Sequence, residues 1–400
     1  MPQPKTQLGR QFPSWLILMG LLTALGPLAI DLYLPAFPMI AADLKSSEAN
    51  VERTLASYLL GMALAQLFYG PISDRFGRKP PLIFGLTLFS IASVVVAFSQ
   101  DIEHLTLWRI AQAFGGAAGV VMPRAVIRDQ LDTRDAAKAL SIIMLIMGAT
   151  PILAPILGGQ ILQFADWRSL FYIMAFCGVA LLMATTFSMR ETLDPSNITA
   201  LHPKIIFATY TALFKHRGFL LYSLAAAFGS AGMFAYISGS PRTFITVFDI
   251  PVAWFGALFG LNAFCLILAS QIGVRLLNLA SPRRLLRLAQ NTQLSIVFTG
   301  LLCTLLGIMN VYGMMAMLMG FMACQGIISP NAAALALAEQ GKRLGAASAL
   351  MGTIQMLCGA LAGLAVSSWQ QLSALPLATV LAACVLISWY SGRRAEKHTG

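Results

Sequence analysis

The chain has 400 residues, of which 58% are hydrophobic and only 11% are charged, with a formal net charge of +11. Soluble domains carry about 25% charged residues, so this composition excludes a protein built from soluble domains. A membrane-spanning helix needs roughly 20 apolar residues, which leaves room for about twelve such helices joined by short loops.

Twelve apolar runs separated by polar segments predict an all-α integral membrane protein with twelve transmembrane helices. We expect these helices at residues 15–36, 54–72, 81–99, 105–127, 139–162, 169–189, 218–240, 252–274, 286–308, 312–336, 344–367 and 373–391. Two of the intervening segments are read as polar loops, an outer one at residues 43–53 and an inner one at residues 128–138.

The longest polar stretch, residues 190–217, separates the predicted helices into two groups of six and includes an amphipathic piece around residues 203–214. Two six-helix halves joined by a long loop are typical of transporters built from parallel repeats. We therefore predict an N-terminal bundle at 1–189, a cytoplasmic inter-bundle loop at 190–217 and a C-terminal bundle at 218–400.

The positions of the basic residues predict the orientation of the chain. When the loops are taken alternately, 22 of the 27 Lys and Arg residues fall on the side that holds both termini, and four fall on the other side. Cytoplasmic loops are enriched in Lys and Arg. We expect a multi-pass protein of the bacterial cytoplasmic (inner) membrane with both termini cytoplasmic, and no binding of nucleic acid.

The six cysteines all lie in apolar runs without a C-x-x-C pair, and the four histidines lie in loops or at the tail. The cysteines are interpreted as small core residues rather than disulfides or metal ligands. We predict no metal site and no cofactor.

A short charged hairpin, residues 70–82, joins the second and third predicted helices on the cytoplasmic side. It packs a serine, an acid, two arginines and a lysine between two long apolar runs, and its candidate functional residues are Gly70, Asp74, Arg75, Gly77 and Arg78. Gly345 opens the eleventh predicted helix at the same face, and a carboxylate is favoured near a helix N-terminus. Asp74 is thus a candidate partner for that helix end, and the alternative is a loop charge paired with Arg75 or Arg78.

Asp31 and Arg109 are the only charges that we cannot assign to a loop. Both lie roughly 6–8 Å below the outer membrane boundary at 1.5 Å per helical residue, so they can face one cavity and pair directly or through water. Ionisable residues inside a membrane are expensive and indicate function by default. We predict a proton and substrate site; the alternative is a structural ion pair.

Other polar residues inside the predicted helices are candidates for the lining of a substrate cavity, although each alone is more often a contact between helices. They are Tyr33, Tyr58, Gln66, Asn262, Gln325, Asn331 and Gln355. The 19 Met and 24 Phe residues can supply an adaptable apolar pocket.

Three stretches resemble motifs of the major facilitator superfamily. Residues 70–79 are similar to its G-x-L-x-D-R-x-G-R-K signature, with Ile72 in place of Leu, and residues 109–112 are similar to its arginine motif, although Ala113 follows where glycine is usual. The fifth predicted helix resembles the antiporter motif G-x(6)-G-P-x-x-G-G, with Ala154 in place of one glycine; its candidate residues are Gly148, Pro151, Pro155, Gly158 and Gly159.

Residues 31–36, the Arg124-x-x-x-Arg128-Asp129 segment and residues 329–331 narrow this resemblance to the bicyclomycin-resistance (Bcr/CflA) branch of drug/proton antiporters. The resemblance implies two six-helix bundles around a central cavity, proton coupling through Arg109, and a latch at Asp74 that holds the two halves together in the outward-open state. It also implies export of small amphipathic molecules in exchange for protons, and we expect a monomer in the lipid bilayer.

Our hypothesis makes Asp31 the proton carrier, loaded from the outside and emptied by substrate on the inside. As the only embedded acid, it suggests one proton per cycle. No G-x-x-x-x-G-K-[ST] motif is present, so the proton gradient is the expected energy source.

Three alternatives remain beside this hypothesis. A proton-coupled exporter of a metabolite, such as a peptide, an amino acid or a purine, would have the same fold, and fold does not settle substrate. An intramembrane enzyme is disfavoured by the absence of paired carboxylates or a His/Glu set in the apolar runs, and a channel by the absence of a re-entrant filter segment.

Overall fold

The computed structural model describes residues 14–194, 203–341, 344–369 and 372–399. In these ranges the chain is helical throughout its regular structure. The helices of the first half are α1 (Ser14–Asp31), η1 (Leu34–Ala36), α2 (Phe37–Asp43), α3 (Glu48–Phe76), α4 (Lys79–Ala97), α5 (Ile102–Gln130), α6 (Thr133–Ile161) and α7 (Arg168–Ser188). Then follow α8 (Pro203–Lys215), α9 (Arg217–Pro241), the π-helix η3 (Arg242–Val247), α10 (Val252–Leu276), α11 (Pro282–Leu305), α12 (Val311–Leu337), α13 (Leu344–Ser367) and α14 (Leu375–Thr399).

A helix lies at each of the twelve predicted positions, and the all-helical membrane fold is confirmed. Eleven helices of the described chain are long and apolar enough to cross a membrane. The remaining one, α11, has 24 residues but opens on a basic turn with Arg283, Arg284 and Arg287, which lowers its hydropathy. The predicted amphipathic piece of the inter-bundle loop forms α8.

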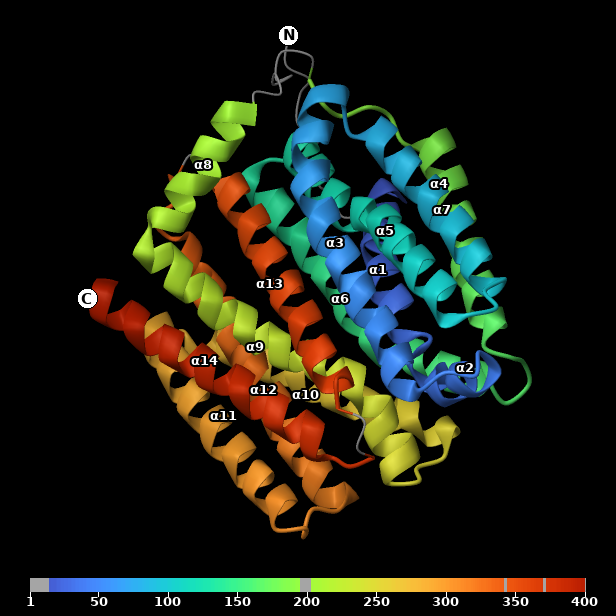
Figure 1. The fold of residues 1–400 in the computed structure, drawn as a ribbon. Helices are drawn as coiled ribbons and strands as arrows, with labels where there is room; N and C mark the ends of the chain where they lie inside the picture. Colours follow the sequence, from blue (N-terminus) through green and yellow to red (C-terminus); the bar gives the residue numbers. More distant parts are fainter. Residues whose placement is uncertain (1–13, 195–202, 342–343, 370–371, 400) are drawn as a thin grey trace.

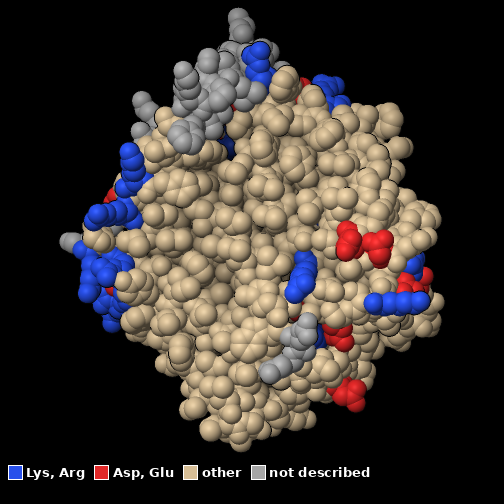
Figure 2. Space-filling model, viewed as in Figure 1, with Lys and Arg blue, Asp and Glu red and all other residues tan. Residues whose placement is uncertain are grey.

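The two halves of the chain lie side by side and meet along two helix pairs, α3 with α13 and α6 with α10. Figure 1 shows the blue-to-green helices on one side, the yellow-to-red helices on the other, and α13 between α3 and α9. Figure 2 shows a face that is mostly uncharged, as expected for a surface in contact with lipid, with a few charged side chains on its lower half and along its rim. The end of the molecule that carries α8 is the predicted cytoplasmic face, and the opposite end is the predicted outer face.

The two predicted polar loops are largely helical, so this part of the prediction is wrong. α3 begins at Glu48, where Ser47 Oγ accepts a hydrogen bond from Asn50 N at 3.3 Å. α6 begins at Thr133, where Asp132 Oδ1 accepts from Asp135 N at 2.8 Å. These side chains cap the free N–H groups of the first turns, so the helices extend beyond the apolar runs.

The first predicted helix is also wrong at its outer end. α1 stops at Asp31, and the chain continues through the short helix η1 into α2. Pro35 has no N–H to donate to the carbonyl oxygen of Asp31, four residues earlier, and its ring crowds that oxygen, which favours a break at this point. The break leaves Asp31 at the last position of α1.

The Gly- and Pro-rich stretch of α6 remains one α-helix through Pro151 and Pro155. Gly158 allows this helix to lie directly on the carbonyl oxygen of Leu32, because a Cβ at position 158 would overlap that oxygen. The glycine therefore fixes how closely α6 approaches the break after Asp31.

Candidate functional site

Arg109 lies at the centre of the first half, on α5, with no exposed surface. Its guanidinium carbon is 4.2 Å from the ring centroid of Tyr33 and 4.3 Å from that of Tyr58. Nη1 donates to Gln112 Oε1, and Nη2 donates to the carbonyl oxygen of Ala29 at 3.0 Å. Aromatic faces and one carbonyl thus hold the cation, although Nε has no hydrogen-bond partner.

Asp31 is 2% exposed, and its Oδ1 is buried without a hydrogen-bond partner. It lies two residues beyond Ala29, whose carbonyl oxygen accepts from Arg109, so the end of α1 carries both the acid and a backbone acceptor for the base. No ion pair joins these two residues in the described chain; the contacts of Arg109 go to aromatic rings, an amide and a backbone carbonyl instead. Oδ1 of this carboxyl group is therefore buried without a compensating contact in the described chain.

The second half of the chain approaches Asp31 through Tyr236 of α9. Asp31 acts electrostatically on Tyr236 and on Tyr58. Tyr236 is fully buried, stacks on Phe259 with ring centroids 5.2 Å apart, and leaves its hydroxyl unpaired, as does Asn262 with its Oδ1. The sequence analysis missed Tyr236; the small residues around it in α9, which let helices pack closely, are the signal that could have found it.

The structure gathers only part of the predicted cavity lining around this site. Tyr33 and Tyr58 cover Arg109, and Asn262 lies beside Tyr236. The other four predicted residues are not gathered around Arg109 and Tyr236. Gln66 lies against Gly352 of α13, and Gln325 lies against Gly229 of α9. Asn331 donates to Ile327 O in its own helix, and Gln355 is half-buried on α13.

The prediction that Asp31 and Arg109 are the only embedded charges is wrong. Glu52 on α3 has no exposed surface, and Arg242 at the start of η3 is 5% exposed. Both lie outside the predicted transmembrane helices, and Glu52 also has the charged neighbours Glu48 and Arg53. One face of each helix turns inward, so Glu52 is buried while its neighbour Arg53 is exposed. The argument for one proton per cycle loses its premise.

The charged hairpin is built around Arg78. Its guanidinium contacts Asp74 Oδ1 at 2.5 Å and Asp129 Oδ2 at 2.9 Å, so Asp74 is paired within its own half. The start of α13 faces a different residue, since a Cβ on Gly345 would lie 4.0 Å from Arg128 Nη1. The proposed latch between Asp74 and the second half remains a prediction.

Glu191, which the sequence analysis did not single out, stabilises this hairpin from beyond α7. Its carboxylate accepts from the backbone N–H of Arg78 at 2.8 Å and of Lys79 at 3.0 Å, which satisfies the first turn of α4. Partial burial opposes ionisation, but the backbone donors outweigh it and hold the pKa of Glu191 below its ordinary value. Gly77 has a φ of +92°, and a Cβ there would overlap the Glu191 carboxylate.

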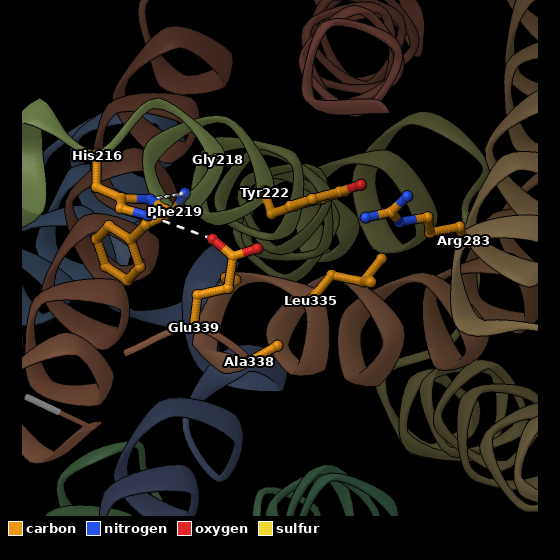
Figure 3. A pocket seen from close by; sticks show the side chains of 9 residues that line it. His216, Gly218, Phe219, Tyr222, Arg283, Leu335, Ala338 and Glu339 are labelled. Atoms are coloured by element: carbon orange, nitrogen blue, oxygen red, sulfur yellow. Dashed lines mark hydrogen bonds and ion pairs between the residues drawn. The ribbon is translucent and has the colours of Figure 1, made fainter. Parts of the chain in front are cut away.

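Figure 3 shows a small pocket at the predicted cytoplasmic end of α9 and α12, with His216, Phe219 and Glu339 at one end, Arg283 at the other, and Tyr222 and Leu335 between them. His216 Nε2 lies 3.3 Å from Glu339 Oε2. The pocket holds about 50 Å³, whereas ligand pockets take roughly 300–1,000 Å³. It is therefore no candidate for a drug site. In the part of the chain that was searched, no cluster of His, Cys, Asp or Glu could hold a metal ion.

Comparisons with known proteins agree with this architecture. The family model of the Major Facilitator Superfamily matches residues 19–363. A bicyclomycin resistance protein homolog of Haemophilus influenzae is 33% identical over 377 residues, covering 94% of each chain. The multidrug resistance protein MdtL of Escherichia coli O45:K1 is 30% identical over 384 residues, covering 94% of this chain and 96% of its own.

A solved structure has the same fold. The inward-facing, occupied form of a bacterial homolog of the human lysosomal transporter Spinster superposes with a TM-score of 0.72 at 16% identity, covering 96% of both chains.

Proposed function

The chain belongs to the major facilitator superfamily, and from this premise we propose that it exports small amphipathic molecules in exchange for protons. It is a multi-pass membrane transporter and not an enzyme. The names of its relatives concern resistance to bicyclomycin and to several drugs, which supports drugs as the substrate class here. We place it in the bacterial cytoplasmic membrane with both termini cytoplasmic.

The observation that carries the proposal is the buried, unpaired carboxyl oxygen of Asp31 beside the caged Arg109. A buried ionised carboxylate without a partner costs several kcal/mol, on the order of the insertion penalties for charged residues. Asp31 therefore takes up a proton when the site opens outward and gives it up when substrate enters from the inside. Arg109 is held in place by the two aromatic faces and the carbonyl oxygen of Ala29.

Alternating access couples the two events. The proton and the substrate compete for one site. The site therefore turns from the inside to the outside with substrate bound, and turns back to the inside with a proton bound. Tyr236 of the second half lies within electrostatic range of Asp31, so loading the acid changes the interaction between the halves. This is what a carrier requires, since a ligand shifts a conformational equilibrium only by binding the two states differently.

Transport into proteoliposomes with an imposed pH gradient tests the proposal. The panel contains bicyclomycin, several cationic and neutral amphipathic drugs, and labelled peptides, amino acids and purines. We expect accumulation of at least one drug against its own gradient, abolished when the pH gradient is collapsed. Uphill movement of a metabolite and of no drug would assign the chain to the metabolite exporters. Transport that never exceeds equilibration would contradict proton coupling.

A further inference from the structure

A second pair of buried charges joins the two halves at the predicted outer face. Arg242 Nε of η3 lies 3.5 Å from Glu52 Oε1 of α3. Glu52 is fully buried and Arg242 is 5% exposed. One residue comes from each half, 190 positions apart, so this pair crosses the plane along which the halves must separate.

A second contact follows the same seam. The hydroxyl of Thr246 donates to both carboxylate oxygens of Glu48 at 2.9 Å. Glu48 lies one turn before Glu52 on α3, and Thr246 lies four residues after Arg242 on η3. Two contacts therefore join the first turns of α3 to the short helix η3, about one turn apart on each, so the seam is closed at two points rather than one.

The ion pair between Glu52 and Arg242 is not reinforced by hydrogen bonds to the Glu52 carboxylate, so it can separate. Neither oxygen of Glu52 has a hydrogen-bond partner, so attraction to Arg242 is its main compensation for burial. Within its own half, Arg242 donates a hydrogen bond from Nη2 to the carbonyl oxygen of Trp369 at 3.0 Å. The π-helix that carries it is a rare element found frequently at functional sites. When water enters between the halves, both charges regain hydration, which offsets the loss of their mutual attraction.

We infer that Glu52 and Arg242 form the outer gate of the transporter, closing the substrate path while they are paired and separating when it opens to the outside. This inference rests on the proposed alternating-access function. The groups that act on Glu52 are Arg242 of η3 and Glu48 and Arg53 of its own helix. Because Arg53 is exposed and bonded to Asn50, Arg242 alone among them is a buried counter-charge.

Removing one member of a buried pair leaves an uncompensated charge, which is strongly unfavourable, whereas removing both is often tolerated. Glu52→Gln and Arg242→Gln should therefore each shift the protein toward the conformation that is open to the outside. The double variant should restore the conformation in which the outer face is closed. In Arg242→Gln, protonation of Glu52 removes the remaining charge, so closure should return in acid.

Closure is measured by cross-linking Glu48→Cys to Thr246→Cys with a short bifunctional thiol reagent. A protease site is inserted within residues 195–202. After cleavage, the two halves of an uncross-linked chain run as separate bands on a gel, whereas a cross-linked chain stays in one band. The measurement uses membranes without substrate or pH gradient, so it stands even if proton-coupled drug transport is disproved. Single-cysteine chains control for the six native cysteines.

We expect Glu52→Gln to slow cross-linking by about tenfold and the double variant to recover it to within about twofold. Arg53→Gln, one residue away and exposed, should leave the rate unchanged. The inference is overturned if Glu52→Gln cross-links like the parent. If Glu52→Gln fails to insert, the test uses Arg242→Gln, whose cross-linking rate is compared at pH 8 and at pH 5.5 in the same membranes. Each rate is divided by the rate of the parent at that pH. Equal ratios at the two pH values would also overturn the inference.

Discussion

Arg109 and Tyr58 are in cation–π contact, with the guanidinium carbon 4.3 Å from the ring centroid. Tyr58 is itself fixed, since its hydroxyl donates to the carbonyl oxygen of Gly26 at 3.4 Å. The contact therefore links α5, α3 and α1 through one buried cation. A buried interaction of this kind is worth about 2 kcal/mol or more.

Arg109→Lys should lower transport by about tenfold or more while leaving the amount of inserted protein unchanged. A lysine ammonium keeps the charge but cannot stack between two rings and donate to both Gln112 and Ala29. Initial rates in proteoliposomes at equal protein measure this. Arg53→Lys, on the exposed face of α3, is the matched control and should transport normally. Full activity of Arg109→Lys would show that only charge matters at this position.

Asp31→Asn should abolish accumulation driven by a pH gradient, because the amide keeps the size of the side chain and cannot exchange a proton. Substrate binding and downhill exchange should survive in part, since the surrounding rings remain. The comparison is uphill accumulation against counterflow in the same proteoliposomes. The proton-carrier role of Asp31 is falsified if the Asn variant still concentrates substrate from a pH gradient.

Gly158→Ala should destabilise the protein by about 1–3 kcal/mol, the usual cost of overpacking. The new Cβ meets the backbone oxygen of Leu32, which cannot rotate away. Gly70→Ala is the control, since a Cβ there has no neighbour within 4 Å. Thermal unfolding in detergent should show a lower midpoint for Gly158→Ala alone. Equal midpoints would mean that α6 shifts freely on α1.

Glu191 makes the hairpin sensitive to acid. Its pKa is lowered from 4.5 in the folded protein, so its stabilising effect is present above pH 4.5 and is lost as the pH falls through the lower folded value. The parent should lose stability over that acid range, and Glu191→Gln should lose less there while being less stable at pH 7. Unfolding midpoints between pH 3 and pH 7 measure both. Parallel curves for the two proteins would contradict this role of Glu191.

Reporter fusions after Thr6 and after Lys397 should both give cytoplasmic signals. The prediction follows from the 22 basic residues assigned to one side of the membrane. Periplasmic signals at both positions would reverse the two faces and move the Glu52–Arg242 gate to the cytoplasmic side, and a periplasmic signal at one position alone would contradict an even number of spans. The cross-linking experiment would still detect the gate, because it does not depend on orientation.

The sequence predicts this fold well because long apolar runs leave few alternatives to membrane helices. It fails at helix ends, where Ser47 and Asp132 continue the helix into polar sequence that was interpreted as loop. Within the site, an embedded charge such as Asp31 or Arg109 is visible in sequence because its neighbours are apolar. Glu52 is hidden among charged neighbours, and only the packing of Arg242 against it reveals its burial.

The four charges buried in the outer halves of the helices also have an electrical consequence. Asp31 and Glu52 balance Arg109 and Arg242, so the protein without a bound proton carries no net charge in this region. Each proton that binds leaves one positive charge inside the membrane, worth about 2.3 kcal/mol for every 100 mV that it crosses. For the proposed exchange, a potential that is negative inside therefore drives the inward return of the protonated form, and export of an uncharged drug carries one positive charge inward for each proton.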